Sequence, residues 1–464
     1  DSNKKFLIEE LNIDDDIATY LSEFSNKIKE NDEKYIKENW KKYNQYIKDK
    51  IIPKGVLTYN SIILLTYELF NNCAIKEFYQ KYFPIVFIDE FQDTNYIAWM
   101  LINELIGSQT RICFLGDSLQ RIYGFIGALP DLMERAQKKL EMRKFCLNKN
   151  YRFKDNLEML NLDKNIRLNA IKLDNDVITE ESNPDIVLLS NQENEAKWIA
   201  KEVKEISKNG NVAILVRTGI SNNNTLKIKE ILDKSNVEYF YALFTDEDNE
   251  YKNFHIKCLE EFNGLIKNKN VVTYNILQNL KNNIEKIYNS EDALIKSLIK
   301  LLNLFCDNVL EECKYLNQEE KINYIRDTFE NNGLRQSLEK LDEKIILATV
   351  HACKGLEYKY VIVADNEQNS FPTYMGACKD CYQGNKENPK CKKRFYSNNE
   401  PQYYEELSVF YVAFTRAREK VIFTMSKERL NYNGNSGRTV GSCFLKLKGI
   451  GYNNFKNLSD TEIQ

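Results

Sequence analysis

The pattern of apolar and polar positions is clearest at Ile85–Ile88, four apolar residues that run directly into Asp89 and Glu90. A run without polar alternation is typical of a strand buried on both faces, as in a parallel sheet. Pro84 stands where a strand can begin. The two acids then emerge at the carboxyl end, where open α/β sheets hold their ligands. One carboxylate there can hold Mg²⁺ and the next can orient a water molecule, although an ordinary acidic turn gives the same pattern.

Further short apolar runs predict more buried strands, and helical patterns separate most of them. These runs cover residues 111–115, 185–189, 212–217, 345–349, 360–364 and 421–424. Strands that alternate with helices predict the α/β class, with mainly parallel sheets and helices on both faces.

Amphipathic patterns predict helices in much of the remaining chain. Residues 1–50 alternate Lys with Asp and Glu around spaced apolar positions, which predicts two helices of a solvated subdomain. Residues 59–71 predict a helix with Asn60 or Ser61 as its N-cap, and residues 405–417 predict another. Residues 224–235 and 253–333 are rich in Lys, Glu, Ile and Leu and carry no chemical motif, so they predict a helical insertion.

Length and charge narrow the class of protein. The 464 residues exceed what one core usually holds and predict two to four domains. Lys and Arg total 65 against 68 Asp and Glu, a net charge of −3, so nucleic-acid binding would need a local basic channel.

No apolar run is long enough to span a bilayer and no signal peptide is visible, so we expect a cytoplasmic protein without a membrane segment. The eleven cysteines are mostly isolated in apolar segments, which is typical of reduced core thiols: Cys73, Cys113, Cys146, Cys258 and Cys306.

Five motifs follow one another along the chain. Residues 85–94 are followed by Gly-Asp-Ser-Leu-Gln-Arg-Ile-Tyr-Gly-Phe at 116–125, Asn-Tyr-Arg at 150–152, Thr-Val-His-Ala-Cys-Lys-Gly-Leu-Glu at 349–357 and Tyr-Val-Ala-Phe-Thr-Arg-Ala at 411–417. In this order they resemble motifs II to VI of the UvrD/Rep family of superfamily 1 DNA helicases, from about residue 59 to residue 423.

The resemblance implies two RecA-like domains of the P-loop NTPase type, with the nucleotide between them, and helical insertions. Residues 1–55 would be a helical remnant of the insertion called 1B, and 56–130 the C-terminal part of domain 1A. Residues 131–222 and 344–464 would form domain 2A, interrupted by a reduced 2B-like helical insertion at 223–343.

The resemblance also implies roles in ATP hydrolysis. Asp89 would hold Mg²⁺, Glu90 would orient the attacking water, and Gln120 would sense the γ-phosphate. Arg152 would reach the γ-phosphate and Arg416 would be the arginine finger. The further residues expected near the nucleotide are Gln92, Asp93, Tyr151 against the adenine, Gly355, Glu357 on the ribose, and Arg418 as a second candidate finger.

Four residues are expected to face DNA. Tyr123 and Phe125 match aromatics on which single-stranded bases stack, although two aromatics two positions apart also suit a strand in a core. His351 and Lys354 would face DNA or the interdomain cleft. The family usually has Arg where this chain has Ile126, which puts one contact in doubt. The implied activity is 3′→5′ movement on single-stranded or partly duplex DNA, in DNA repair or in antiviral defence beside a nuclease partner, as in Gabija systems.

A phosphate-binding loop is not found in the sequence. The family needs a Gly-rich loop ending in Gly-Lys-Thr or Gly-Lys-Ser, whereas the nearest imitation, residues 434–439, has Arg for Lys and follows the last motif. We therefore expect that on the order of a hundred preceding residues carry this loop, and that the chain as given is inactive alone. The alternative is an ATPase-deficient subunit that senses nucleotide or DNA and scaffolds a nuclease partner.

Three cysteines lie in a polar segment between the last two motifs. Cys378 and Cys381 are two residues apart in the Cys-x-x-Cys pattern, and Cys391 follows among glycines and lysines. Such spacing suits a zinc knuckle, but a fourth ligand is not evident. A loop with incidental thiols is the alternative.

Overall fold

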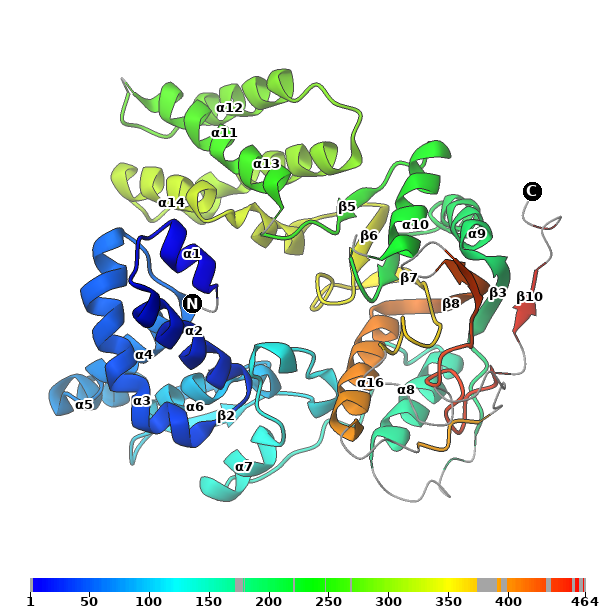
Figure 1. Ribbon diagram of the computed structural model, residues 1–464, viewed down its shortest axis with the longest axis horizontal. Coiled ribbons are helices and arrows are strands. Elements are labelled where there is room, and N and C mark those ends of the chain that lie inside the picture. Colours follow the sequence, from blue (N-terminus) through cyan, green and yellow to red (C-terminus); the bar gives the residue numbers. More distant parts are fainter. Residues whose placement is uncertain are drawn as a thin grey trace. The chain divides into compact units, whose positions relative to one another are not determined.

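The computed structural model of the 464-residue chain describes residues 3–171, 178, 180–219, 222–246, 248–267, 269–373, 390–393, 399–430, 435–452, 455–458 and 462. The chain divides into two compact units, Asp1–Lys149 and Asn150–Gln464 (Figure 1). The first unit thus extends beyond residue 130, where the sequence suggested a handover. The reason is α7 (Leu132–Lys139), whose Leu132 and Ala136 are buried in the core of the first unit.

The first unit is mostly helical. Its N-terminal part holds three helices where the sequence predicted two: α1 (Lys4–Glu9), α2 (Asp15–Lys29) and α3 (Glu33–Tyr46). A π-helical turn and a 3-10 turn, Ile47–Ile51 and Ile52–Lys54, lead to α4 (Tyr59–Leu69), α5 (Cys73–Tyr82) and α6 (Tyr96–Leu105). The N-cap of α4 is Thr58, which forms a capping box with Ser61, so the cap lies before both positions that the sequence suggested.

Two parallel strands complete the first unit, β1 (Ile85–Ile88) and β2 (Arg111–Phe114), with Ile88 opposite Phe114. Ile88 and Phe114 pack against the core of this unit. Ile85 and Phe87 point to the other face, where Phe87 is 67% exposed. The prediction of a strand buried on both faces was therefore wrong for the described chain, since the residues described cover only one face of β1.

The second unit contains an eight-stranded sheet in the order β10-β3-β8-β7-β4-β6-β5, with β9 antiparallel at the end of β8 and every other pairing parallel. Its strands are β3 (Asp185–Asn191), β4 (Val212–Val216), β5 (Phe240–Ala242), β6 (Ile345–Thr349), β7 (Tyr358–Val363), β8 (Ala417–Leu430), β9 (Ser436–Arg438) and β10 (Lys456–Asn457). The predicted α/β class with parallel sheets is confirmed.

Helices cover both faces of this sheet. Figure 1 shows α9 (Gln192–Ile206) and α10 (Asn223–Lys234) on one side, and α8 (Leu157–Ala170) and α16 (Glu400–Thr415) on the other. The connection from β3 through α9 to β4 runs along the sheet in one direction, and that from β7 through α16 to β8 runs in the opposite direction. Because such crossovers are right-handed, the two helices lie on opposite faces.

A separate group of helices is inserted between β5 and β6. It contains α11 (Asn249–Ile266), α12 (Tyr274–Ile287), α13 (Ala293–Glu312), α14 (Gln318–Glu330) and a 3-10 segment, Gly333–Lys340. Its core includes Phe262, Phe305 and Phe329. The helical insertion therefore begins after residue 223, because α10 packs on α9 and β5 pairs with β6 as part of the sheet.

Candidate functional sites

Two acids follow β1 directly, as the sequence predicted. Glu90 adopts a left-handed backbone conformation with φ of 50°, which is uncommon for a residue with a side chain. The Asp89 carboxylate accepts a hydrogen bond from the Glu90 amide at 2.8 Å through Oδ1. This left-handed turn holds the Asp89 and Glu90 carboxylates directly at the end of β1. Asp93 closes the short 3-10 turn Phe91–Asp93 that follows.

Gln92 joins this acidic turn to the next motif. Its side chain is buried, its Nε2 donates to Glu90 Oε2, and its Oε1 accepts from the Asp117 amide at 3.0 Å. Asp117 in turn accepts from Gln120 Nε2 at 3.0 Å. A chain of hydrogen bonds therefore connects Glu90 to Gln120, two residues for which the sequence predicted related roles.

The space for this connection depends on Gly116. A Cβ atom at this position would lie 2.5 Å from Gln92 Oε1, far inside contact distance. The backbone holds the two segments in register, because Phe91 N donates to Leu115 O at 2.9 Å and Leu115 N donates to Ile88 O at 2.8 Å. The glycine thus permits the close approach of the two motifs.

The two aromatics of the following loop face outward. Phe125 is 62% exposed and Tyr123 is half-buried, and their ring centroids lie 6.1 Å apart with planes tilted by 50°. The loop is anchored beneath them by buried Ile122 and by Arg121, which donates to Ala128 O at 3.3 Å. The core-strand alternative does not hold, because Phe125 lies on a 3-10 turn with its ring exposed.

In the second unit, one carboxylate binds two guanidinium groups. Arg152 Nη2 and Arg418 Nε donate to the two oxygens of Glu357, the latter at 2.8 Å, and Arg152 Nη1 donates to Thr415 O at 2.6 Å. Partial burial alone would raise the pKa of Glu357, but the charges and hydrogen bonds of the two arginines outweigh it and hold the pKa below its ordinary value. The sequence did not predict this shared contact, which joins residues more than 200 positions apart.

Arg416 lies beside this cluster but is 3% exposed. Its Nε donates to Val412 O at 3.2 Å and its Nη1 donates to Leu356 O at 3.2 Å. The backbone thus holds this guanidinium at the end of α16, next to the residue that precedes Glu357.

The remaining predicted residues of the second unit lie on two turns. Tyr151 is 69% exposed on the turn before α8. His351 and Lys354 are half-buried in the turn that follows β6, and Gly355 ends that turn with φ of 87°. The turn thus carries the chain from the carboxyl end of β6 back to Glu357 at the start of β7.

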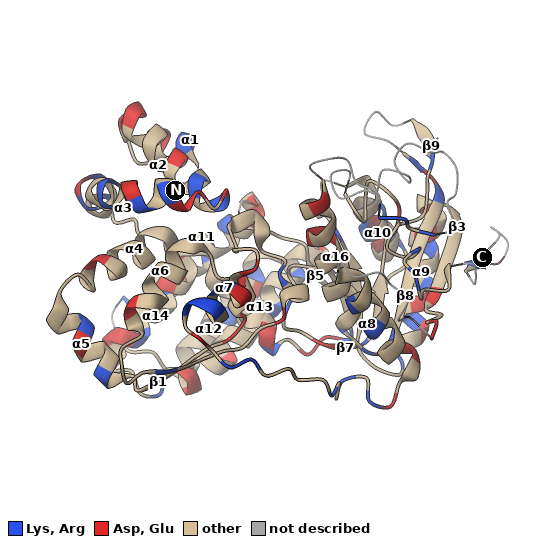
Figure 2. Ribbon diagram, turned by 90° about the horizontal axis from the view of Figure 1, so that it is seen from below, with Lys and Arg blue, Asp and Glu red and all other residues tan. Residues whose placement is uncertain are grey.

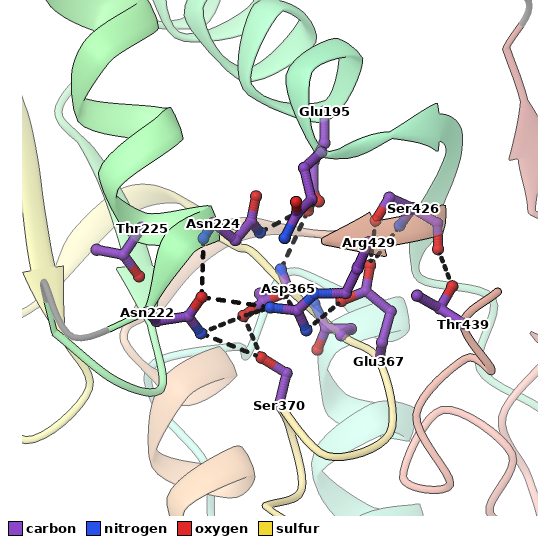
Figure 3. A network of polar contacts seen from close by, with 12 residues as sticks. Glu195, Asn222, Asn224, Thr225, Asp365, Glu367, Ser370, Ser426, Arg429 and Thr439 are labelled. Carbon is purple, nitrogen blue, oxygen red and sulfur yellow. Dashed lines mark hydrogen bonds and ion pairs between the residues drawn. The ribbon is translucent and has the colours of Figure 1, made fainter. Parts of the chain in front are cut away.

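A buried polar network, undetected in the sequence, lies at the carboxyl ends of β4, β7 and β8 (Figure 3). Arg429 pairs with Asp365 at 2.8 Å and with Glu367 at 3.2 Å. Asn222 Nδ2 donates to Asp365 at 2.9 Å. Burial and the charge of Asp365 raise the pKa of Glu367, whereas the pKa of Asp365 is lowered because Arg429 outweighs the cost of its burial.

Glu195 on α9 is the third acid of this network and is fully buried. It accepts from the Asp365 amide at 3.1 Å and from Thr424 Oγ1 at 2.6 Å through Oε1, and from Asn224 Nδ2 at 3.3 Å through Oε2. Burial, and then the charge of Asp365, raise the pKa of Glu195 to about 7. Three acids therefore share one arginine, and only Asp365 has its pKa lowered.

A further, partly buried ion pair anchors α16. Arg217, directly after β4, donates to both carboxylate oxygens of Glu406 at 2.5 to 3.2 Å. The residues are 189 positions apart, so no local signal in the sequence could have linked them. The pair fixes the helix whose end carries Thr415 and Arg416.

Metal binding by cysteine is not visible in the described chain. Cys378 and Cys381 lie outside the described residues, and Cys391 lies 3.7 Å from Tyr403 Oη. Within the described ranges, no group of three or more His, Cys, Asp or Glu could hold a metal ion. The expectation of core thiols was correct for Cys258 and Cys306, which are buried, and wrong for Cys73 and Cys146, which are exposed.

Charges of both signs alternate along the described helices. Figure 2 shows Lys and Arg interspersed with Asp and Glu along the helices of each unit. Many of these are pairs within one helix, such as Lys257 with Glu260 at 3.0 Å. Among the described helices, none has the length and hydropathy that a bilayer crossing requires.

Two family models match the chain and together cover more than half of it. The UvrD/REP helicase N-terminal domain matches residues 3–141, and the UvrD-like helicase C-terminal domain matches residues 243–428. The chain is 24% identical over 474 residues to proteins named ATP-dependent DNA helicase PcrA from Staphylococcus epidermidis and Staphylococcus aureus, which covers 84% of this chain and 61% of each relative. A protein named Probable DNA helicase II homolog from Rickettsia conorii is 24% identical over 465 residues, covering 83% of this chain and 67% of the relative. The chain thus spans about three fifths of the length of the PcrA relatives.

Proposed function

Because the chain belongs to the UvrD/Rep family of helicases, we propose that it is the larger part of an ATP-dependent motor that moves 3′→5′ on single-stranded DNA and unwinds duplex DNA. The direction of movement is carried over from the family resemblance. The observation that supports the motor best is the hydrogen-bond chain from Glu90 through Gln92 and Asp117 to Gln120.

In this proposal the first unit supplies the groups that act on the attacking water. Glu90 orients the water and accepts its proton, and Gln120 contacts the γ-phosphate. When Gln120 moves in response to the γ-phosphate, the movement is transmitted to Glu90 through Asp117 and Gln92. Asp89 offers the carboxylate oxygens that Mg²⁺ prefers, and bound Mg²⁺ would neutralise phosphate charge.

The second unit supplies cations and the sugar contact. Arg152 and Arg416 neutralise charge that develops as the γ-phosphate leaves, while Tyr151 lies against the base and Glu357 accepts from the ribose. The exposed rings of Tyr123 and Phe125 stack with DNA bases without sequence preference, and His351 and Lys354 contact the strand. The buried free thiols Cys258 and Cys306 support a cytoplasmic location.

Replacement of Glu90 tests the motor. In the full-length protein, Glu90→Gln should lower DNA-stimulated ATP turnover at least ~100-fold and leave ATP binding intact, because only the water-orienting base is lost. Glu77→Gln is a matched control, since Glu77 is an exposed acid of the first unit that pairs with Lys81 on α5. Wild-type turnover in the Glu90→Gln protein would refute the assigned role.

A second candidate function is a sensor that binds nucleotide or DNA and scaffolds a nuclease partner. A Gly-rich loop ending in Gly-Lys-Thr or Gly-Lys-Ser in the full-length protein would favour the motor, and a full-length protein without one would favour the sensor. For this function, the full-length protein would bind ATP and DNA but hydrolyse no ATP under any DNA stimulation. DNA repair and antiviral defence are both compatible with the motor, and deletion strains challenged with DNA damage or with phage would separate them.

A further inference from the structure

We propose that Glu357 is an internal counter-anion that occupies the phosphate-binding arginines when no nucleotide is present, and that Arg418 is the second of these arginines. The inference rests on the proposed function and deepens it, because it assigns a phosphate contact and a release step to the same site.

The geometry of the cluster carries the proposal. A single carboxylate is shared by two guanidinium groups from distant segments, Arg152 before α8 and Arg418 on β8. Arg152 is held in place by its second contact, to Thr415 O at 2.6 Å. Arg418 donates to Glu357 through Nε, which leaves the outer edge of its guanidinium in solvent, and its side chain is 62% exposed. The arginines are therefore positioned by the protein, while the edge of one of them remains accessible.

The charge balance favours an incoming anion. Two guanidinium groups face one carboxylate, and Arg416 adds a third cation through its contact with Leu356 O, next to Glu357. The cluster thus carries a net positive charge even with Glu357 in place. A phosphate group bears more charge and more acceptor oxygens than a carboxylate, and two guanidinium groups can bind it in a bidentate way. Phosphate should therefore displace Glu357 from the arginines.

Water offsets part of the cost of this displacement. The side chains of Arg152 and Glu357 are 29% and 30% exposed, so water can solvate both groups as the pair separates. The released carboxylate becomes free to accept a hydrogen bond from a ribose hydroxyl, the contact assigned to it above. Glu357 thus couples phosphate binding to sugar binding. It can contact the ribose only after the phosphates have displaced it from Arg152 and Arg418.

Tripolyphosphate tests the proposal without a sugar or base. Binding to the 464-residue chain would be measured by calorimetry at fixed salt. Arg418→Ala should weaken binding about tenfold, because one charge-assisted contact is lost. Glu357→Gln should strengthen it by a similar factor, because the competing anion is removed. The double variant should bind about as tightly as the wild type, since the loss of Arg418 and the removal of the anion that competes for Arg152 offset each other.

Lys420→Ala is the matched control. Lys420 is a half-exposed cation two positions further along β8, paired with Asp185 at 2.5 Å and separate from Glu357, so its loss should leave tripolyphosphate affinity unchanged. Circular dichroism would verify that each variant is folded, and Arg418→Lys would restore part of the affinity.

The outcome separates this inference from the proposed function. Weaker or unchanged binding in Glu357→Gln, or no measurable tripolyphosphate binding by either wild type or Glu357→Gln, would overturn the counter-anion role. If tripolyphosphate behaves as expected but the full-length protein neither binds nor hydrolyses ATP, the cluster is a phosphate site and the motor is refuted. If ATP is hydrolysed but neither substitution changes tripolyphosphate affinity, the roles proposed for Glu357 and Arg418 both fail and the motor stands.

Discussion

Replacement of Glu195 by Gln should stabilise the second unit at alkaline pH and have little effect at acidic pH. Glu195 is fully buried among Asp365, Glu367 and Arg429, and its pKa is raised to about 7 by burial and by Asp365. A raised pKa means that the folded protein binds the proton more tightly than the unfolded chain. The stabilisation is therefore fully present below about 4.5 and is lost as the pH rises through about 7.

The magnitude follows from the same values. Between the unfolded and folded pKa values, each pH unit lowers the free energy of unfolding by about 1.4 kcal/mol. From pH 5.5 to about 7 the wild type therefore loses roughly 2 kcal/mol of stability. Gln is an uncharged isostere and avoids this cost. Its amide oxygen can still accept from Asp365 N and Thr424 Oγ1, as Oε1 does now.

The amide nitrogen of the introduced glutamine also has a hydrogen-bond partner. Asn224 Oδ1 is buried and, within the described chain, has no hydrogen-bond partner. Rotation of the Asn224 amide by 180° exchanges its oxygen and nitrogen, so that its oxygen can accept from the amide nitrogen of the Glu195→Gln protein, or from protonated Glu195.

Amide hydrogen exchange in α9 would measure the effect. Wild type and Glu195→Gln are compared at the same pH, so that intrinsic exchange rates cancel, from pH 5.5 to 8.5. The ratio of their opening constants should change roughly thirtyfold over this range, which corresponds to about 2 kcal/mol. Glu193→Gln is the control, since Glu193 lies on the same helix but its pKa is lowered by Lys197, and its effect should be flat over this range. If the ratio of opening constants for wild type and Glu195→Gln does not change with pH, the raised pKa of Glu195 is refuted.

Three further predictions follow from other parts of the structure. Phe125→Ala, and to a lesser degree Tyr123→Ala, should weaken single-stranded DNA binding by about 1–3 kcal/mol per lost base contact, which salt-dependent fluorescence anisotropy on mixed sequences would show; a strong sequence preference would contradict stacking. If the cysteine-rich segment binds zinc, elemental analysis should find close to one zinc per chain and less in Cys381→Ser, whereas equal and near-zero zinc in both would exclude it. His255 Nδ1 donates to Tyr251 O at 2.8 Å and Nε2 accepts from Leu334 N at 3.3 Å, both within the insertion, and burial lowers the pKa of His255. The stability of the insertion should therefore be lost as the pH falls below about 6.5, and thermal unfolding of His255→Gln at pH 5 and 7 should lack this dependence.

The sequence located five of the eight strands described in the second unit, β3, β4, β6, β7 and β8, because each contains a continuous apolar run. The bounds of β6 agree at both ends, and β4 differs by one residue. By contrast β5 has three residues and follows a helical pattern, so periodicity had too few positions to detect it. The run at Ile85–Ile88 predicted a strand correctly, but an apolar pattern cannot tell which face other residues cover.

The candidate site was predictable only as far as it lies within motifs. The roles of Asp89, Glu90 and Gln120 follow from the motif resemblance and stay predictions, but the contact that joins Glu90 to Gln120 through Gln92 depends on where β1 and β2 pair. The pair Arg217–Glu406 and the acids around Arg429 leave no pattern, because their partners are far apart in sequence and each acid alone resembles an ordinary charged residue.

The strand order of the second unit has a consequence for synthesis. β8 is among the last strands to leave the ribosome, yet it lies between β3 and β7 and pairs with both. Thr424 on β8 follows its partner Glu195 by 229 positions, which at about 5–20 residues per second takes on the order of 10 to 50 s. β3 lacks β8 as a pairing partner throughout that interval, and β7, which is complete only at Val363, lacks it while the residues up to 424 are made, so each presents an unpaired edge. The nascent chain should therefore depend on chaperones, and a ribosome that stalls before residue 417 should release a product that aggregates rather than a smaller folded domain.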